Sequence, residues 1–322
     1  MTKVLIISNK SDITTDFIVK ELKRRDINFY RLNTEELTKT CFVTLDFGSN
    51  LFLIKDTVLN VEVNLKHISS VYYRRPELPL IDNSELSAGE ETFLKNEITY
   101  CLEGIYKILR DAYWISPLFA IRQAENKIYQ LDIAKSIGFI IPDSIITNDY
   151  DKLNYFRERN NHECIIKPIR SGLISDESES KVIFTNTLSG LSFTKAEFEM
   201  SPNYIQQHIR KRGDIRVTMV GNKAYATLIH SQIDVKTKTD WRKGESELKH
   251  SKIKLPDLLK QKCDELMTGL NLRFGAIDFI LNETGEYVFL EINPNGQWAW
   301  IERKTGYKIS EEIVNLLVYE NY

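Results

Sequence analysis

The chain has 322 residues, of which 42% are hydrophobic and 27% are charged, and its formal net charge at pH 7 is −2. This length favours two or three domains, and the composition is typical of a globular protein. A net charge so close to zero gives no general attraction to nucleic acid or to a membrane surface, so neither is expected as a partner.

The N-terminal stretch MTKVLIISNK contains an apolar run too short for a signal peptide or a membrane span. Four cysteines are widely spaced and form no CxxC pair: Cys41, Cys101, Cys164 and Cys263. Such cysteines are typical of reduced thiols, so we expect a cytoplasmic protein.

Residues 1–117 are expected to form an N-terminal α/β domain. An apolar strand is predicted at 4–8 and a helix at 14–25, followed by strand-like runs at 41–47, 51–54, 58–65 and 69–76. A long helix is predicted over 88–112, where Ser87 and Glu90 have the spacing of a capping box. The sequence Trp-Ile-Ser-Pro at 114–117 then marks a domain boundary.

A central domain is expected over 118–203. It opens with a helix at 123–137, ended by Gly138, and continues with the strands FIIPDSIIT and ECIIKPI on either side of a polar helix at 149–160. From Arg170 to Glu179 the composition changes to Ser, Gly, Asp and Glu, which predicts a mobile loop.

The last domain is expected over 204–322. It contains two hairpins with short Gly-Asn and Glu-Thr-Gly turns, and it ends with an amphipathic helix at 310–318. In the second hairpin, FGAIDFIL (274–281) and EYVFLEIN (286–293) flank a four-residue turn. If Leu281 pairs with Glu286, Asp278 lies opposite Phe289 and is a diagonal neighbour of Glu291 on the same face.

Asp278, Glu291 and Asn293 would then converge near one strand end. A solvated polar strand end is the alternative interpretation. This face is otherwise aromatic, and two like charges placed together in such surroundings are costly unless a cation joins them. Hard oxygen ligands of this kind suit Mg²⁺, so we favour a metal site.

Neither GxxxxGK[ST] nor GxGxxG occurs in the sequence, so no glycine-rich phosphate-binding loop is expected. Any phosphate must therefore be bound by individual cationic side chains. Lys167 lies inside the apolar strand CIIKP, where a lysine needs an anionic partner or a solvent-filled cleft. Lys127, on a helix face, is a weaker candidate by itself. Arg216 shares a strand face with Asp214, and an internal Asp–Arg ion pair is the alternative there.

Taken in order, six short elements resemble the ATP-grasp enzymes: ENK (125–127), CIIKP (164–168), YIQQHI (204–209), GDIRVTMVG (213–221), FGAIDFIL (274–281) and FLEINPNG (289–296). The ending EINPNGQWAWIE, together with YYRRP, is more specifically similar to the microviridin-type peptide ligases, or graspetide synthetases, relatives of the ribosomal-protein glutamate ligases. The resemblance covers essentially the whole chain. It implies an α/β ATP-grasp fold, in which an N-terminal α/β lobe is followed by two α+β lobes that clasp the nucleotide.

The resemblance also implies a role for each matching residue. The nucleotide phosphates would be held by Lys127 and Lys167. The hinge at adenine would be formed by Gln206, Gln207, His208 and Ile209. Asp214 would also bind the nucleotide. Many relatives have an acidic hinge residue where Gln206-Gln207 stands. The metal ligands would be Asp278, Glu291 and Asn293. Arg216 would face the transferred phosphate and act with Lys167 in catalysis, and the loop 170–180 would be the lid.

The implied activity is the ATP-dependent, ADP-forming macrocyclisation of a ribosomally made precursor peptide that has a leader and an acidic core. Asp or Glu side chains would be activated as acyl phosphates and attacked by Ser/Thr hydroxyls to give esters, which we favour slightly, or by Lys amines to give amides. The implied cofactors are ATP and Mg²⁺, with two ions expected, and a homodimer is left open.

Two alternative functions are a glutamate or amino-acid ligase that modifies a protein or small molecule, and a catalytically silent peptide-binding module. The complete set of Lys, Arg, Asp, Glu and Asn residues argues against the silent module. Aromatic and basic residues favour a long acidic peptide as the substrate: Arg74, Arg75, Trp241, Arg242, Trp298 and Trp300. For the tryptophans, core packing is the alternative interpretation.

Overall fold

The computed structural model describes residues 3–319, except 82–84, 171–172, 176–179, 184, 235–236 and 244–247. It divides into two compact units, one formed by Met1–Leu118 with Gln297–Tyr322 and the other by Phe119–Gly296. The residues from Gln297 onward therefore group with the N-terminal domain and not with the rest of the expected last domain. The boundary expected between central and last domains lies inside the second unit and remains a prediction.

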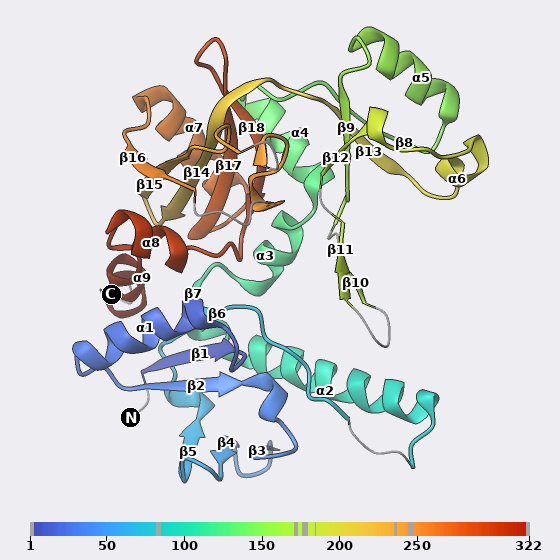
Figure 1. The fold of residues 1–322 in the computed structure, drawn as a ribbon. Coiled ribbons are helices and arrows are strands. Elements are labelled where there is room, and N and C mark those ends of the chain that lie inside the picture. Colours follow the sequence, from blue (N-terminus) through green and yellow to red (C-terminus); the bar gives the residue numbers. More distant parts are fainter. Residues whose placement is uncertain are drawn as a thin grey trace. The chain divides into compact units, whose positions relative to one another are not determined.

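The first unit is built on a parallel sheet with the strand order β2-β1-β6-β7 (Figure 1). Its strands are β1 (Val4–Ser8), β2 (Phe29–Asn33), β6 (Ser70–Tyr73) and β7 (Tyr113–Ile115). The uninterrupted apolar run of β1 is buried along its whole length, as expected for an inner strand of a parallel sheet. The sequence interpretation included β1 and β6 but missed β2, whose alternating FYRLN is short and half polar.

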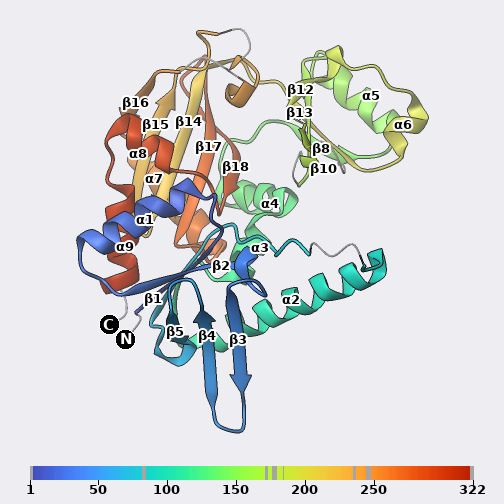
Figure 2. The ribbon, with the colours of Figure 1, turned by 60° about the horizontal axis from the view of Figure 1, so that its bottom comes forward.

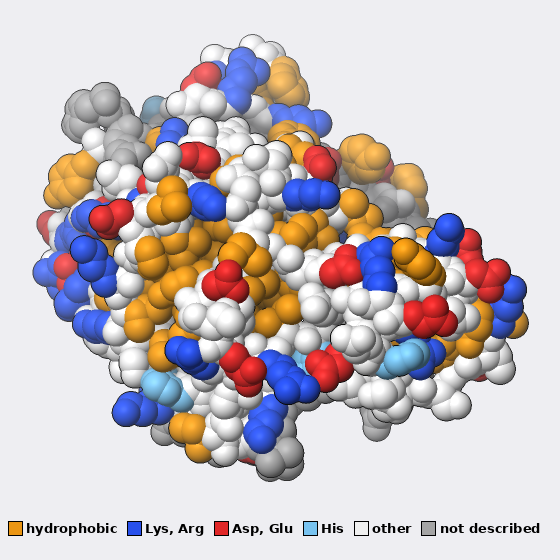
Figure 3. All heavy atoms as spheres, turned by 90° about the horizontal axis from the view of Figure 1, so that it is seen from above, with side chains coloured by type: hydrophobic (Ala, Val, Ile, Leu, Met, Phe, Trp, Pro, Cys, Tyr) orange, Lys and Arg blue, Asp and Glu red, His pale blue; other side chains and the backbone are white. Residues whose placement is uncertain are grey.

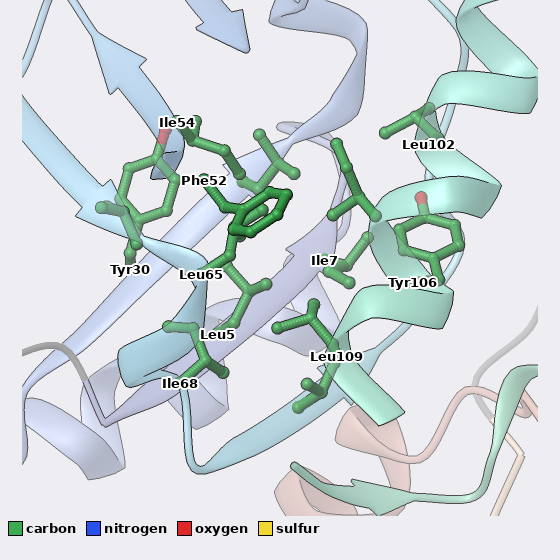
Figure 4. Packing of buried hydrophobic residues seen from close by; sticks show 14 of the residues in the cluster. Leu5, Ile7, Tyr30, Phe52, Ile54, Leu65, Ile68, Leu102, Tyr106 and Leu109 are labelled. Atoms are coloured by element: carbon green, nitrogen blue, oxygen red, sulfur yellow. The ribbon is translucent and has the colours of Figure 1, made fainter. Parts of the chain in front are cut away.

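A core cluster joins this sheet to helix α2 (Ala88–Ile108) and to an antiparallel sheet of β3 (Cys41–Asp46), β4 (Leu51–Asp56) and β5 (Val61–Asn64). Figure 4 shows Leu5 and Ile7 of β1 beside Phe52 of β4, with Tyr106 of α2 facing them. The predicted capping box of Ser87 and Glu90 starts α2, because each side chain bonds the backbone N–H of the other. Helix α1 (Ile13–Arg24) also belongs to this unit.

The C-terminal segment completes the first unit through α8 (Ala299–Thr305) and α9 (Ile309–Tyr319). Trp298 is 0% exposed; its Nε1 donates to the hydroxyl of Tyr72 at 3.4 Å, and its ring lies edge-on to Phe17. Arg74 is 1% exposed and forms an ion pair with Asp12 at 2.7 Å. The expectation that Arg74 and Trp298 offer contacts to a peptide is therefore wrong, because both side chains are inside the core of this unit.

The second unit contains an antiparallel sheet with the order β16-β15-β14-β17-β18, whose strands lie side by side in Figure 2. These strands are β14 (Lys211–Val220), β15 (Lys223–Ile229), β16 (His250–Ile253), β17 (Phe274–Asn282) and β18 (Tyr287–Asn293). Helix α7 (Asp257–Gly269) packs with α4 (Lys127–Ile137) in the same unit.

The helix predicted at 123–137 is two helices, α3 (Leu118–Ala124) and α4. Asn126 separates them, because its side chain accepts hydrogen bonds from the N–H groups of Ile128 and Tyr129 and so caps a new helix. Gly138 ends α4 with φ of 85°, as the sequence predicts.

A smaller sheet in the second unit has the order β12-β9-β13-β8. Its strands are β8 (Ser144–Thr147), β9 (Cys164–Lys167), β12 (Asn186–Thr187) and β13 (Asn203–Gln207), and its helices are α5 (Tyr150–Arg159) and α6 (Lys195–Glu199). In the region predicted as a loop, β10 (Leu173–Ser175) and β11 (Ser180–Val182) form an antiparallel hairpin. Its tip, 176–179, lies outside the described residues, so the mobility of this region remains a prediction.

Two surface properties agree with the composition. In the part of the chain that the structure describes, none of the helices combines the length and the apolar character needed to cross a membrane. On the face drawn in Figure 3, basic and acidic side chains are intermixed, as expected for a net charge of −2.

Candidate active site

Strands β17 and β18 place Asp278 directly opposite Glu291. The sequence predicted a diagonal relation, with Asp278 opposite Phe289, and this register is wrong. Phe289 pairs with Phe279 instead, and the register shifts between these pairs, so Leu290 is the extra residue of a β-bulge.

The turn also differs from the prediction by one residue. Asn282 donates its N–H to the carbonyl of Glu286 at 3.0 Å, which closes a three-residue loop. Gly285 in this loop has a φ of +91°, the left-handed geometry that such hairpin loops require. Loop and bulge together bring the two carboxylates closer in register than the sequence predicts.

A row of charged residues crosses three adjacent strands. Arg216 on β14 pairs with Asp278 on β17, which pairs with Glu291 on β18. Asn293 follows one row further along, opposite Ala276. Arg216 donates from Nε to Oδ1 of Asp278 at 2.5 Å and from Nη2 to Oδ2 at 3.0 Å. The ion pair considered from the sequence therefore exists, but its acidic partner is Asp278 and not Asp214.

Lys127 is the first residue of α4, and its ammonium group lies 3.2 Å from Oε2 of Glu291. The same group donates to the carbonyl oxygen of Pro168 at 3.1 Å, directly after β9. Lys127 therefore connects the smaller sheet to the row of charges. Both Lys127 and Glu291 keep about a fifth of their side-chain surface exposed, so the pair is open to a ligand.

Lys167, at the end of β9, lies over the ring of Tyr204, with its Nζ 4.7 Å from the ring centroid. Burial lowers the pKa of Lys167 to about 8, although the charge of Glu291 opposes this shift. A half-buried lysine near such a pKa gains a large electrostatic benefit from an incoming anion.

Nucleotide affinity is expected to fall as the pH rises through about 8, because Lys167 is charged below its pKa and neutral above it. If a bound phosphate requires the charged form, the Kd for ADP should rise about tenfold between pH 7 and pH 9. Isothermal calorimetry at several pH values measures this. Lys167→Arg is the control, because arginine stays charged throughout this range. The Kd of this variant for ADP should not change with pH. A pH-independent Kd in the unmodified protein would contradict the role of Lys167.

The two carboxylates of the row have pKa values shifted in opposite directions. Burial raises the pKa of Asp278 to about 6; the charge of Arg216 opposes this rise and that of Glu291 adds to it. Burial also works to raise the pKa of Glu291, but the charges of Lys127, Lys167 and Arg242 hold it below its usual value. Two adjacent acids that repel each other in this way are suited to share a cation.

The oxygen donors of the row fit Mg²⁺. Among the described residues, no group of three or more His, Cys, Asp and Glu side chains could hold a metal ion. An ion here would therefore depend on Asp278, Glu291, the amide oxygen of Asn293 and phosphate oxygens, which is a common arrangement for Mg²⁺. The Asn293 Oδ1 accepts from the N–H of Asn295 at 3.0 Å, which leaves its second lone pair available.

The predicted adenine hinge lies at the end of β13. Gln206 is buried, and its Nε2 donates to the hydroxyls of Ser144 and Tyr204, both at 2.9 Å. Its Oε1 is buried and has no hydrogen-bond partner in the described part of the chain. The N–H groups of Gln207 and His208 already donate to backbone carbonyls, so Gln206 Oε1 is the better candidate acceptor for an amino group at this hinge. Ile209 follows directly and is half-buried.

The carboxylate of Asp214 is hydrogen-bonded to other residues of the second unit. Both of its oxygens accept from Nζ of Lys211 at 2.8 Å, and it also accepts from the hydroxyl of Ser231. Burial raises its pKa, against the opposing charge of Lys211. The structure therefore shows an internal ion pair at this position, and a contact from Asp214 to nucleotide remains a prediction.

The triplet Asp240, Trp241 and Arg242 extends the site beyond the residues that the sequence selected. Arg242 forms an ion pair with Asp240 at 2.7 Å and helps to lower the pKa of Glu291. The Trp241 ring centroid lies 5.8 Å from the guanidinium of Arg216. The sequence interpretation placed Trp241 and Arg242 on the peptide side and missed Asp240, although an acid two residues before an arginine is a recognisable local ion pair.

Fold and site together define an ATP-grasp ligase. Residues 3–122 match the family described as the MvdD pre-ATP grasp domain, and residues 124–317 match the RimK-like ATP-grasp domain. The chain therefore belongs to the RimK-like ATP-grasp family and carries an MvdD-type pre-ATP grasp domain. A comparison with curated proteins finds no match.

Solved structures agree with this family. A RiPP-associated ATP-grasp ligase from Chryseobacterium gregarium, in complex with ADP and a leader and core peptide, is 27% identical over 99% of this chain and 97% of its own, with a TM-score of 0.89. The macrocyclases MdnB and MdnC of Microcystis aeruginosa MRC are 25% and 23% identical, with TM-scores of 0.83 and 0.85. Each match covers 99% of this chain, together with 100% of MdnB and 99% of MdnC. MdnC is bound with the precursor peptide MdnA. The fold class and the family resemblance predicted from the sequence are confirmed.

Proposed function

We propose that this protein uses ATP and Mg²⁺ to join side chains of a ribosomally made precursor peptide into a macrocycle. The observation that carries the proposal is the row of Arg216, Asp278 and Glu291, with Lys127 bound to Glu291. The complex of the C. gregarium ligase with ADP and a leader and core peptide supports both the nucleotide and the peptide partner.

The cationic residues would act on the phosphates and on the acid to be activated. Lys127 and Lys167 would bind phosphate oxygens, and Arg216 would neutralise charge on the transferred phosphoryl group and on the incoming carboxylate. Mg²⁺ held by Asp278, Glu291 and Asn293, proposed as two ions, would supply further charge neutralisation at the phosphates. A peptide Asp or Glu then takes the γ-phosphoryl group from ATP, and ADP leaves.

A nucleophile of the same peptide then attacks the acyl carbon, and phosphate leaves with its electron pair. A Ser or Thr hydroxyl gives an ester, the product that we slightly favour, and a Lys amine gives an amide. The leader segment would bind apart from this chemistry and raise the effective concentration of the acidic core.

Free cysteines, of which Cys41, Cys164 and Cys263 are buried, support a cytoplasmic location; a homodimer stays open.

The test uses the purified protein with ATP, Mg²⁺ and candidate precursor peptides, chosen as short reading frames beside its gene that end in an acidic segment rich in Ser, Thr or Lys. Mass spectrometry is expected to show the loss of one water for each bond formed, with one ADP released per bond. Treatment with mild hydroxide then distinguishes ester from amide products, because it hydrolyses esters and leaves amides intact. Addition of an amino acid to the peptide would instead support the glutamate-ligase alternative, and absence of ADP release in the presence of peptide would support a silent binding module.

A further inference from the structure

The side chain of Gln130 is bound to β18, the strand that carries two of the three candidate metal ligands. It is 2% exposed. Its Oε1 accepts from the backbone N–H of Ile292 at 3.0 Å, and its Nε2 donates to the carbonyl oxygen of Ile292 at 2.8 Å. The same Nε2 donates to the carbonyl oxygen of Ala124 at 2.5 Å, where α3 ends. The carboxamide therefore joins α3, α4 and β18 at one point.

Gln130 takes the place of a missing neighbouring strand. β18 is at the edge of its sheet, and Ile292 pairs with Ile277 on its inner side. Backbone groups of an edge strand that point away from the sheet need partners when they are buried. The carboxamide supplies a donor and an acceptor to one residue, as a paired strand would.

The position of Gln130 in α4 links its contact with Ile292 to Lys127, the lysine proposed to bind phosphate. Gln130 lies three residues after Lys127 in α4, so the two side chains are on the same face of the helix. On the strand, Ile292 directly follows Glu291. One helix face thus makes two contacts with two consecutive strand residues, Lys127 with Glu291 and Gln130 with Ile292.

A second contact fixes the other end of the helix. After α4, the carbonyl of Ile140 accepts from the N–H of Phe289 at 2.8 Å. The bulge at Leu290 lies between this contact and Ile292. A bulge locally disrupts the ladder of its strand, so the contact at Ile140 alone does not fix the strand beyond it. Gln130 fixes the part that carries Glu291 and Asn293.

We propose that Gln130 is a positioning residue that holds Lys127 at the distance from Glu291 needed to bind a nucleotide phosphate beside Mg²⁺. The inference rests on the proposed function, because Lys127 is given its phosphate role there. The carboxamide of Gln130 is bound to the backbone of Ile292 and Ala124, so in this proposal Gln130 acts through Lys127 and the strand and not by contact with nucleotide or metal.

The test measures Mg²⁺-dependent ADP binding by calorimetry in the absence of peptide. Gln130→Met keeps the length of the side chain but removes all three hydrogen bonds, and we expect about a tenfold higher Kd. If Gln130 acts through Lys127, the same substitution added to Lys127→Met should raise the Kd less than about twofold, because the coupled contact is already lost. Gln130→Glu, which still accepts from Ile292, gives the same comparison if Gln130→Met does not fold.

Phe139→Leu is the matched control, because Phe139 packs on Phe279 and Phe289 at the far end of α4. It should lower the melting temperature without changing the Kd. An unchanged Kd in Gln130→Met, an undiminished effect in the Lys127→Met background, or an equal rise in Phe139→Leu would each overturn the inference while the proposed function stands. Failure of the unmodified protein to bind ADP would overturn the proposed function and the inference with it.

Discussion

Glu291→Gln is expected to lower ADP formation in the presence of peptide by at least about 100-fold, equivalent to about 2.7 kcal/mol of barrier. The amide fills the same space and can still accept from Lys127, but it no longer offsets the charge of Mg²⁺. Glu291 also interacts with the charges of Lys127 and Lys167, so its neutralisation removes the counter-charge that these two lysines share, whereas Arg242 keeps its ion pair with Asp240. Steady-state release of ADP measures the effect.

Asp278→Asn should have an effect of similar size, because it removes the other carboxylate of the row. Thermal unfolding of both variants is the control for folding, and the melting temperatures should stay near that of the unmodified protein. Turnover within about twofold of the unmodified protein, for either folded variant, would show that the metal ligands lie elsewhere.

Arg216→Ala is expected to abolish water loss from the precursor while leaving peptide binding nearly unchanged. Arg216 is buried in the row and pairs with Asp278, which fits its proposed action on the transferred phosphoryl group better than contact with a remote leader segment. Removing one oxyanion-binding or phosphate-binding cation typically costs about 100-fold or more in rate. Fluorescence anisotropy of labelled precursor and mass spectrometry of the product give the two readouts.

The loss of Arg216 also leaves Asp278 without its cation. Burial raises the pKa of Asp278 to about 6 and the charge of Arg216 opposes this rise, so the pKa should rise further in Arg216→Ala. Arg216→Lys keeps a cation beside Asp278 and should retain folding with only part of the activity. Parallel loss of binding and chemistry in a folded Arg216→Ala protein would instead place this arginine on the peptide-recognition surface.

The sequence predicts which candidate residues share a strand face better than it predicts their register. Asp278 and Glu291 could be assigned to one face because side chains alternate along a strand. Their direct opposition could not be predicted, because it depends on the bulge at Leu290 and the three-residue loop ending at Gly285, neither of which changes the alternating pattern. A register is fixed by packing and turn geometry together, and composition carries little of that information.

Other differences have equally local causes. The break between α3 and α4 depends on the cap at Asn126, which lies in a continuous helical pattern of apolar residues. Gln130 was missed because a single glutamine in a helix has no sequence feature that separates a buried anchor from a solvated side chain. The burial of Arg74 and Trp298 is a tertiary property, since each lies beside polar residues that would suit a surface.

The return of the chain to its first unit sets an order of events during synthesis. The strands and first helices of that unit leave the ribosome early, whereas Trp298, α8 and α9 follow only after the whole of Phe119–Gly296 has been made. Until then Tyr72 and Phe17 lack the indole that covers them, and apolar surface stays exposed to water or to chaperones. The unit that holds the candidate active site can therefore fold first, and the unit that contains Val4–Ser8 is completed only after it.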